Sequence, residues 1–494
     1  MRSPVIRRAC AAAGLIMAAL MVVGCQRADE GETNVLVIGE PPKMADPAAG
    51  PLTETQAVLL QNVGQGLVRF DASGQIVPGL AERWNVTDDG LSYIFRLQPI
   101  EWPDGRKVTA QQVARLLKRQ IASRSDNELK DTLGAIDEIV PMTDRVLEIS
   151  LKASRPHLLQ LLAQPEFSIV REGQGTGPFV VAKDSKPDAL KLQRTVEDLD
   201  EESVAREEVM LGGQPARAAV TAFLKGRTDL VLGGTYADLP FARVQQMPRN
   251  ALRFDPAAGL FGLVPARADG PAADPELRRL LSQAIDRQAL IDALNVPGLL
   301  PRATLIEPGL DGLQPPAAPP WMAIPIEERR AQLAAAVKRQ LGDLEKPVLR
   351  IALPNSPGAR VLFSRLTADW GAIGITLEAV EPGEAADFVL IDKVAPSSSP
   401  AWFVRSFRCG QVPVCDTEAD ELMDGARSAT VAVQRNGLLA QAAQRVDDQQ
   451  LFIALTAPIR WSLVSDRVQG FATNRFGRHT LTSLRQRLDR ERAD

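Results

Sequence analysis

The sequence has little of the residues on which catalytic and metal chemistry most often depends. Among 494 residues there are two histidines, His157 and His479, and four cysteines. A zinc site made of His and Cys needs about four such ligands close together, so this composition argues against one. A Ser-His-Asp triad needs a histidine beside its nucleophile, and the G-x-S-x-G turn that presents such a serine is absent. The sequence therefore predicts a protein that is not an enzyme and that holds no metal or cofactor.

Other scarcities exclude further classes of protein. No basic patch interleaved with aromatic residues occurs, so nucleic acid is not an expected partner. After residue 24 no apolar run is long enough to span a membrane. The formal net charge is −4, and it falls to about −7 without the three arginines of residues 1–24. Charged residues make up 24% and hydrophobic residues 45%, which is ordinary for a globular protein of two or three lobes.

The N-terminal stretch has the pattern of a targeting segment. Arg2, Arg7 and Arg8 precede an apolar run over residues 9–24 that is shorter than a spanning helix, and this pattern is typical of a signal peptide. The ending Val22-Val23-Gly24-Cys25 resembles the bacterial lipobox, which implies cleavage before Cys25 and lipid on its thiol. Residues 25–33 would then be a polar tether to a membrane outside the cytoplasm. The alternative is an ordinary signal peptide or anchor that ends near an unrelated cysteine.

Two further cysteines remain in the body of the chain. Cys409 and Cys415 enclose a short loop with Gly and Pro, C-G-Q-V-P-V-C. In an oxidising compartment such a pair is expected to form a disulfide.

Hydrophobic patterns predict a mixed α/β chain. Residues 34–38 read as a strand, and Asp88-Asp89-Gly90 lies between two alternating runs that predict a hairpin with Leu91, Tyr93, Phe95 and Leu97 on one face. Thr109 to Gln112 form a capping box before a helix. A helix capped by Asp274 is expected to run through the A-I-D-R segment at 284–287, with Asp286 and Arg287 paired or facing solvent. Strand and helix alternate over 326–391, residues 416–448 are helical by pattern, and 451–465 read as strand.

Six blocks of this sequence resemble, in order, those of the family 5 extracellular solute-binding proteins, the oligopeptide- and dipeptide-binding receptors of ABC importers. They are G-L-V-R-F-D-A-S-G-Q-I-V-P-G-L-A-E-R-W-N-V-T-D-D-G-L-S-Y-I-F-R-L (66–97), W-P-D-G-R-K-V-T-A-Q-Q-V (102–113), G-T-G-P-F (175–179), A-V-T-A-F-L-K-G-R-T-D-L-V (219–231), L-R-R-L-L-S-Q-A-I-D-R-Q-A-L-I (277–291) and L-T-A-D-W-G-A-I-G-I-T-L-E (366–378). Gln112 stands where the family usually has Asp.

The resemblance implies an α/β fold of the periplasmic-binding-protein type, a two-lobed clamp (type II, class C) with an extra small domain. The implied ranges are 34–46, 172–262 and 463–494 for a discontinuous lobe I, 47–171 for the small domain and 263–462 for lobe II. Ligand would bind between the lobes, and closure would bury it. The glycine-rich segment 173–178 does not open a helix, which argues against a dinucleotide site, and Gly175 and Gly177 are instead expected to act as a hinge.

The resemblance also implies a function and a site. It implies a monomeric, lipid-anchored binding protein in the periplasm that delivers a peptide or other small solute to ABC permease and ATPase subunits. The segment with which relatives hold the peptide amino group is replaced by I-D-K-V-A-P-S-S-S-P-A-W-F (391–403), where Asp392 or Asp387 would stand in. The expected cleft-lining residues are Trp402, Phe403, Arg405, Phe407, Tyr93 and Trp102. Burial in the core is the alternative for the aromatic ones.

Two other functions stay open. With only two tyrosines and 5% aromatic residues, the chain is lean for a broad peptide cleft. It could instead be an envelope scaffold or sensor that keeps the clamp fold without transport. The third alternative is a periplasmic peptide hydrolase.

Overall fold

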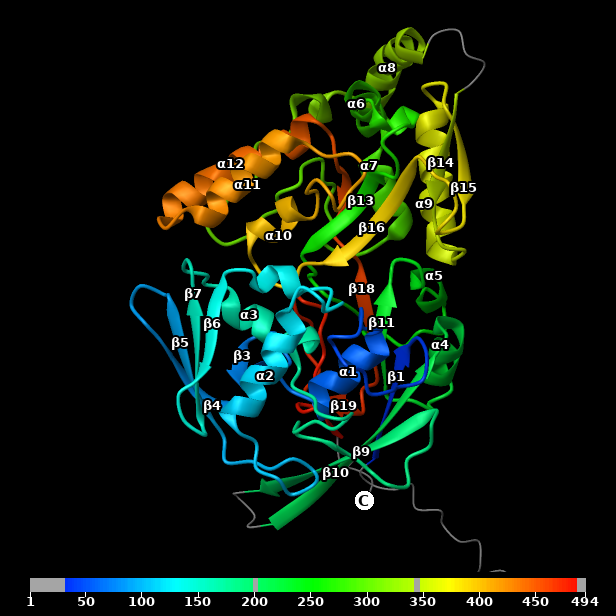
Figure 1. Cartoon of the computed structure of the whole chain (residues 1–494). Coiled ribbons are helices and arrows are strands. Elements are labelled where there is room, and N and C mark those ends of the chain that lie inside the picture. Colours follow the sequence, from blue (N-terminus) through cyan, green and yellow to red (C-terminus); the bar gives the residue numbers. More distant parts are fainter. Residues whose placement is uncertain (1–31, 199–202, 342–346, 487–494) are drawn as a thin grey trace, which may run out of the picture.

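The computed structural model describes residues 32–198, 203–341 and 347–486, and three sheets organise them (Figure 1). The seven-stranded sheet has the order β12-β18-β11-β1-β10-β9-β8, in which β1 runs parallel to β10 and β11. Its strands are β1 (Glu32–Ile38), β8 (Val180–Val181), β9 (Ala189–Asp198), β10 (Ser203–Gln214), β11 (Leu230–Thr235), β12 (Leu252–Phe254) and β18 (Arg460–Val464). With α1 (Glu54–Val63), α4 (Ala216–Leu224) and α5 (Leu239–Ala242) it forms what we call the seven-stranded lobe.

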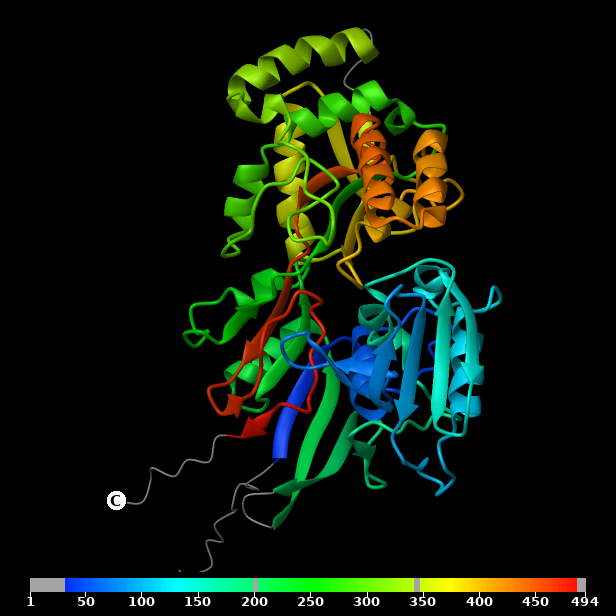
Figure 2. The same ribbon diagram turned by 90° about the vertical axis from the view of Figure 1, so that its left-hand side faces the viewer.

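The four-stranded lobe lies beside it (Figures 1 and 2). Its sheet has the order β4-β5-β7-β6 and is antiparallel throughout. The strands are β4 (Ala81–Val86), β5 (Ser92–Leu97), β6 (Ile136–Pro141) and β7 (Val146–Leu151), accompanied by α2 (Ala110–Ile121), α3 (Leu158–Leu162) and the short helices η1 (Lys130–Leu133) and η2 (Pro165–Phe167). Two small ribbons complete the lower part of the molecule: β2 (Val68–Phe70) with β3 (Ile76–Pro78), and β19 (Val468–Gln469) with β20 (Arg485–Gln486).

The five-stranded lobe lies above both of these (Figures 1 and 2). Its sheet has the order β15-β14-β16-β13-β17. The strands are β13 (Gly259–Pro265), β14 (Val348–Ala352), β15 (Thr376–Val380), β16 (Phe388–Val394) and β17 (Ile453–Thr456). Its helices are α6 (Pro275–Ala284), α7 (Arg287–Leu294), α8 (Ile326–Leu341), α9 (Pro357–Gly371), α10 (Pro400–Arg405), α11 (Thr417–Ser428) and α12 (Ala432–Asp448), with η3 (Pro271–Ala273) and η4 (Pro320–Ala323). The domain boundaries expected from the sequence, 47–171 for the small domain and 263–462 for lobe II among them, stay a prediction.

Local sequence signals explain several of these elements. The expected capping box opens α2, where the Thr109 side chain accepts the N–H of Gln112 and Gln112 accepts that of Thr109. The alternation in β5 buries Tyr93, Phe95 and Leu97. Leu91, which was expected on the same face, is 36% exposed because it lies before the strand begins.

Three predicted segments are each divided in the structure. The helix expected through 284–287 stops at Ala284, where Ile285 has an extended backbone and Asp286 caps α7 by accepting the N–H of Ala289. The region 416–448 forms two helices, α11 and α12, with a break at 429–431. The region 451–465 forms β17 and β18, which belong to different sheets.

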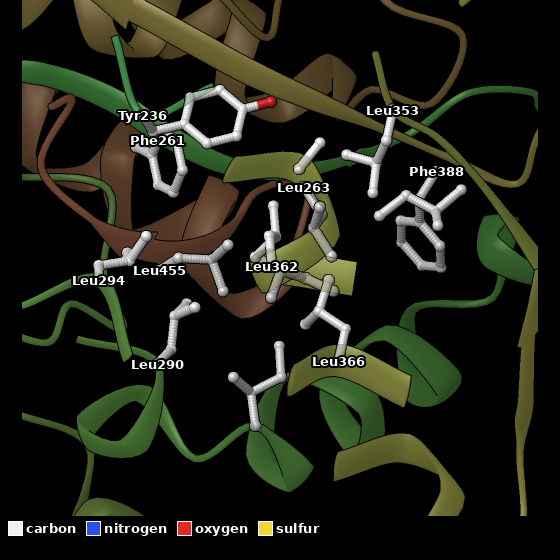
Figure 3. Packing of buried hydrophobic residues seen from close by; sticks show 14 of the residues in the cluster. Tyr236, Phe261, Leu263, Leu290, Leu294, Leu353, Leu362, Leu366, Phe388 and Leu455 are labelled. Atoms are coloured by element: carbon white, nitrogen blue, oxygen red, sulfur yellow. The ribbon is translucent and has the colours of Figure 1, made fainter. Parts of the chain in front are cut away.

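The largest apolar core lies mainly in the five-stranded lobe. Figure 3 shows Leu362 and Leu366 of α9 packed with Leu263 of β13 and Leu455 of β17. The same cluster reaches Val231 in the seven-stranded sheet, so the two sheets share buried apolar contacts. Among the described residues, no helix is both long and apolar enough to cross a membrane.

Candidate functional site

The chain passes between the seven-stranded and five-stranded sheets twice. Residues 255–258 connect β12 to β13, and residues 457–459 connect β17 to β18. The two crossings are adjacent, since β12 pairs with β18 and β13 pairs with β17, both antiparallel. At the crossings the Asp255 N–H donates to the Arg460 carbonyl at 3.0 Å.

A cavity of about 640 Å³ lies beside these crossings, and we call it the inter-lobe cleft. All three lobes contribute to it, which is the placement expected of a ligand site between domains. The lining includes Glu128, Gln164 and Glu166 near the four-stranded sheet, Gly233, Arg460 and Trp461 from the seven-stranded sheet, Ile391 to Pro396, Trp402 and Arg405 from the five-stranded lobe, and Phe476 to His479 from the C-terminal segment.

A buried ion pair links two sheets at this cleft. Asp392 of β16 accepts from the Arg460 guanidinium of β18 at 2.8 Å, and both side chains are less than one-fifth exposed. Arg460 also donates to the Asp392 carbonyl at 3.3 Å. Burial raises the pKa of Asp392, and the adjacent Arg460 charge opposes that shift. The pair therefore ties the five-stranded sheet to the seven-stranded sheet at the cleft.

A second charged group also lines the cleft. Arg478 donates to Glu54 at 3.2 Å and to Glu166 at 3.0 Å. Burial raises the pKa of Glu166, and Arg478 opposes this. The second carboxylate oxygen of Glu166, Oε2, is buried and has no hydrogen-bond partner within the described part of the chain. A buried acceptor without a donor is costly, and Glu166 is one of the residues that line the cleft.

Two more pairs complete the electrostatics of the cleft. Lys393 donates to Glu128 at 3.0 Å, which joins the five-stranded and four-stranded lobes. Asp255 lies 3.1 Å from His479 and also accepts the N–H of Asn474. Most charges around the cleft thus have a partner of opposite sign.

Three of the predicted site residues line the cleft: Asp392, Trp402 and Arg405. Phe403 and Phe407 do not line it. They are 0% and 3% exposed and belong to the apolar core beneath α10, α11 and α12. Trp402 lines the cleft and its ring meets that of Phe403 edge-on, with centroids 5.0 Å apart, so Phe403 lies in the core next to it.

Tyr93 and Trp102 are also core residues, and their prediction as cleft lining is wrong. Both are at most 3% exposed and pack in the four-stranded lobe. Each satisfies its polar atom locally, Tyr93 by donating to the Arg155 carbonyl at 3.1 Å and Trp102 by donating to Gln112 at 2.9 Å. Asp387 lies outside the cleft as well, where it accepts from Arg267 at 2.8 Å and from the Arg350 N–H at 2.8 Å.

The structure does not support a hinge at Gly175 and Gly177. A Cβ on Gly175 would lie 2.2 Å from the Val63 carbonyl oxygen, and one on Gly177 would lie 2.1 Å from that of Gly64. These glycines therefore permit close packing against the end of α1, and the crossings between the two large sheets lie elsewhere.

The expected disulfide between Cys409 and Cys415 is present, between α10 and α11. Cys25 and the predicted signal peptide lie outside the described residues. Within the described ranges, no group of three His, Cys, Asp or Glu side chains is placed to bind a metal.

Sequence reasoning missed Glu166, Arg460 and Arg478. Glu166 and Arg460 each interrupt an apolar run, L-L-A-Q-P-E-F-S-I-V and T-A-P-I-R-W-S-L-V, and a lone charge in a buried stretch was the available signal. Arg478 lies in a polar segment that gave no such signal.

Known proteins are similar to this chain in sequence and in architecture. A probable di/tripeptide-binding protein of Pseudomonas aeruginosa is 25% identical, over 87% of this chain and 91% of its own length. A probable deoxycholate-binding periplasmic protein of Escherichia coli is 24% identical, over 84% and 86%. The crystal structure of Haemophilus influenzae OppA in complex with RPPGFSPFR matches with a TM-score of 0.79 at 15% identity, covering 92% of this chain and 99% of that one.

The fold is thus the mixed α/β architecture of periplasmic binding proteins. The model of the bacterial extracellular solute-binding proteins, family 5, matches residues 75–401, which is more than half of the chain. The chain belongs to the family 5 bacterial extracellular solute-binding proteins.

Proposed function

We propose that this protein is the lipid-anchored substrate-binding component of an ABC importer. It captures a peptide or another small solute between its lobes and delivers it to a membrane permease. The observation that carries the proposal is the inter-lobe cleft, which all three lobes line and whose volume of about 640 Å³ suits a small ligand. The names of the relatives, which include peptide-binding and deoxycholate-binding proteins, support binding rather than catalysis.

The cleft favours a compact polar ligand over a wide range of side chains. Its charges are mostly engaged by partners of opposite sign, and Trp402 is the aromatic side chain that the α10 helix presents to it. The free oxygen of Glu166 is suited to a ligand ammonium or amide, since a carboxylate accepts a charge-assisted hydrogen bond from such a group. An extended peptide would add main-chain hydrogen bonds, as in strand addition.

Thermal unfolding of the full-length protein in detergent tests the binding. Peptide, sugar and bile-acid libraries are added in turn, and a ligand at 100 times its dissociation constant should stabilise the protein by about 2.7 kcal/mol. Glu166→Gln should lower the affinity for the stabilising ligand about tenfold, because it removes a charged acceptor. Arg360→Gln, an exposed change on α9 outside the cleft, should leave the affinity unchanged. If no library stabilises the wild-type protein, the envelope scaffold becomes the better account.

The anchor has its own test. Cells that express the protein are labelled with a fatty acid, and the wild-type protein should carry the label whereas Cys25→Ala should not. Label retained by Cys25→Ala would contradict lipid attachment at this residue. Co-purification of permease and ATPase subunits with the ligand-loaded protein would support delivery.

A further inference from the structure

A second cavity, of about 840 Å³, adjoins the inter-lobe cleft. We call it the arginine cavity. It lies between the four-stranded lobe, which contributes residues 130–136 and 155–157, and helices α10, α11 and α12 of the five-stranded lobe. Asp131, Thr132, Arg405 and Gln411 line both cavities. The two cavities therefore have these four residues as a common wall.

Positive charge dominates this second cavity. Its lining has six cationic side chains, Lys130, Arg155, Arg405, Arg408, Arg427 and Arg435, and three acidic ones, Asp131, Asp311 and Asp420. Some of these charges are paired, since Arg408 and Arg427 share Asp424. The Asp311 carboxylate lies 3.4 Å from His157, whose pKa is lowered by burial.

Arg155, Arg405 and Arg435 differ from the other arginines of the cavity. Within the described ranges, none of the three forms an ion pair, and each donates only to backbone carbonyls. All three are half-buried. Each guanidinium carries five N–H groups, so donors remain for another partner.

These three arginines are drawn together across the boundary between the lobes. Arg155 of the four-stranded lobe donates to the Arg427 carbonyl at 3.0 Å, while Arg405 and Arg435 of the five-stranded lobe donate to the Asp131 and Ser154 carbonyls at 2.7 and 3.1 Å. Arg155 also donates to the Ser154 carbonyl, at 2.9 Å. Because Arg155 and Arg435 share one acceptor oxygen, their guanidinium groups are close neighbours.

Like charges at such short range oppose the approach of the two lobes. Burial lowers the pKa of Arg155 to about 10, and Arg435, Arg405 and Arg427 add to that shift. An anion among the arginines would reverse this effect, because planar guanidinium groups bind carboxylate and phosphate oxygens in pairs. A ligand that relieves the repulsion only in this arrangement favours the closed state.

We propose that the transported ligand carries an anionic group, a carboxylate or a phosphate, that binds among Arg155, Arg405 and Arg435 in the arginine cavity. This inference rests on the proposed function and specifies the class of solute. Neutral solutes of the same shape would bind more weakly, since they leave the three charges unopposed.

Binding of four probes by the full-length protein tests the inference, with calorimetry at constant ionic strength. The probes are trialanine, its C-terminal amide, succinate and inorganic phosphate. At least one anionic probe should bind ten or more times as tightly as trialanine amide. Tight binding of trialanine or succinate would identify the anionic group as a carboxylate, and tight binding of inorganic phosphate would identify it as a phosphate.

Variants locate the effect. Arg155→Gln and Arg435→Gln should each lower the affinity for the anionic probe about tenfold and leave the affinity for trialanine amide unchanged. Arg360→Gln on α9 is the control and should change neither affinity. Circular dichroism checks that each variant folds, and the wild-type comparison of charged and neutral probes does not depend on them. If no anionic probe binds, or if charged and neutral probes bind equally, the inference is overturned. If the libraries described above still yield a neutral ligand, the proposed function stands without it.

Discussion

Arginine side chains carry much of the buried polar structure of this protein. Arg278 and Arg287 are 1% and 4% exposed, and both donate to backbone carbonyls. Arg287 bonds the carbonyls of Ser282, Arg302 and Ala454, which brings distant strand and loop ends together. The A-I-D-R pattern predicted the buried Ala284 and Ile285 correctly. It predicted that Arg287 would face solvent or form an ion pair. This was wrong because the carbonyl partners of Arg287 come from segments up to 167 residues away, which a local pattern does not show.

Asp447 provides a prediction about pH. It accepts the Leu305 N–H at 2.8 Å, and burial raises its pKa to about 7 from 3.8. A carboxyl group with a higher pKa in the folded state binds protons preferentially there, so its contribution to stability is full below about pH 4 and is lost as the pH rises to about 7. Asp447→Asn keeps the acceptor without the charge. The free energy of unfolding in urea should be higher for Asp447→Asn than for the wild-type protein by on the order of 2 kcal/mol at pH 8. At pH 4 the two proteins should have the same free energy of unfolding.

The exposed Asp126 supplies the control for this comparison. Asp126→Asn should change the free energy of unfolding by the same small amount at both pH values. An Asp447→Asn effect that did not vary with pH would show that burial of the charge is not its cause.

At the scale of elements, the sequence predicts where helices begin better than where they end. The capping box at Thr109 and the cap at Asp274 identify their helices because each signal lies within four residues. The break at Ile285 and the division between β17 and β18 were missed, since each depends on contacts with another sheet or helix. The same reason explains Phe403 and Phe407, whose aromatic character was read as ligand binding while α11 and α12 cover them.

Gly177 gives a prediction at this scale. Gly177→Ala should lower the free energy of unfolding by about 1–3 kcal/mol, because its Cβ would collide with the backbone at the end of α1. Gly371→Ala, at the last residue of α9 with open space around it, should be neutral or slightly stabilising. Chemical denaturation measures both. A Gly177→Ala protein that kept its stability but lost ligand affinity would instead favour the hinge that the sequence suggested.

At the scale of the whole molecule, family blocks predicted the fold class and the sequence did not predict the site in full. Asp392 was predicted because it lies in the segment that replaces the amino-group-binding segment of relatives, and Trp402 and Arg405 because they are aromatic and Arg residues beside the expected disulfide; all three line the cleft. Glu166 and Arg478 meet across 312 residues of chain, and no local pattern encodes such a contact.

The link between the lobes yields a further prediction. Asp392→Asn leaves the Arg460 charge buried without its partner and should cost about 3 kcal/mol of unfolding free energy. The matched change Glu378→Gln breaks an ion pair with Arg350 that also joins two neighbouring strands, but both of its side chains are more than half exposed. It should cost less than about 1 kcal/mol. Equal costs would mean that burial at the cleft does not strengthen the Asp392 pair.

The paired crossings at 255–258 and 457–459 constrain how this molecule can move. A single connecting strand could swivel, whereas two antiparallel strands held by the bond from Asp255 to Arg460 resist torsion and bend most readily about one line. Opening and shutting would then follow a single degree of freedom, so every solute that enters is enclosed along the same arc. Selectivity would then depend on the side chains that meet when the lobes are shut, which include Arg155, Arg405 and Arg435.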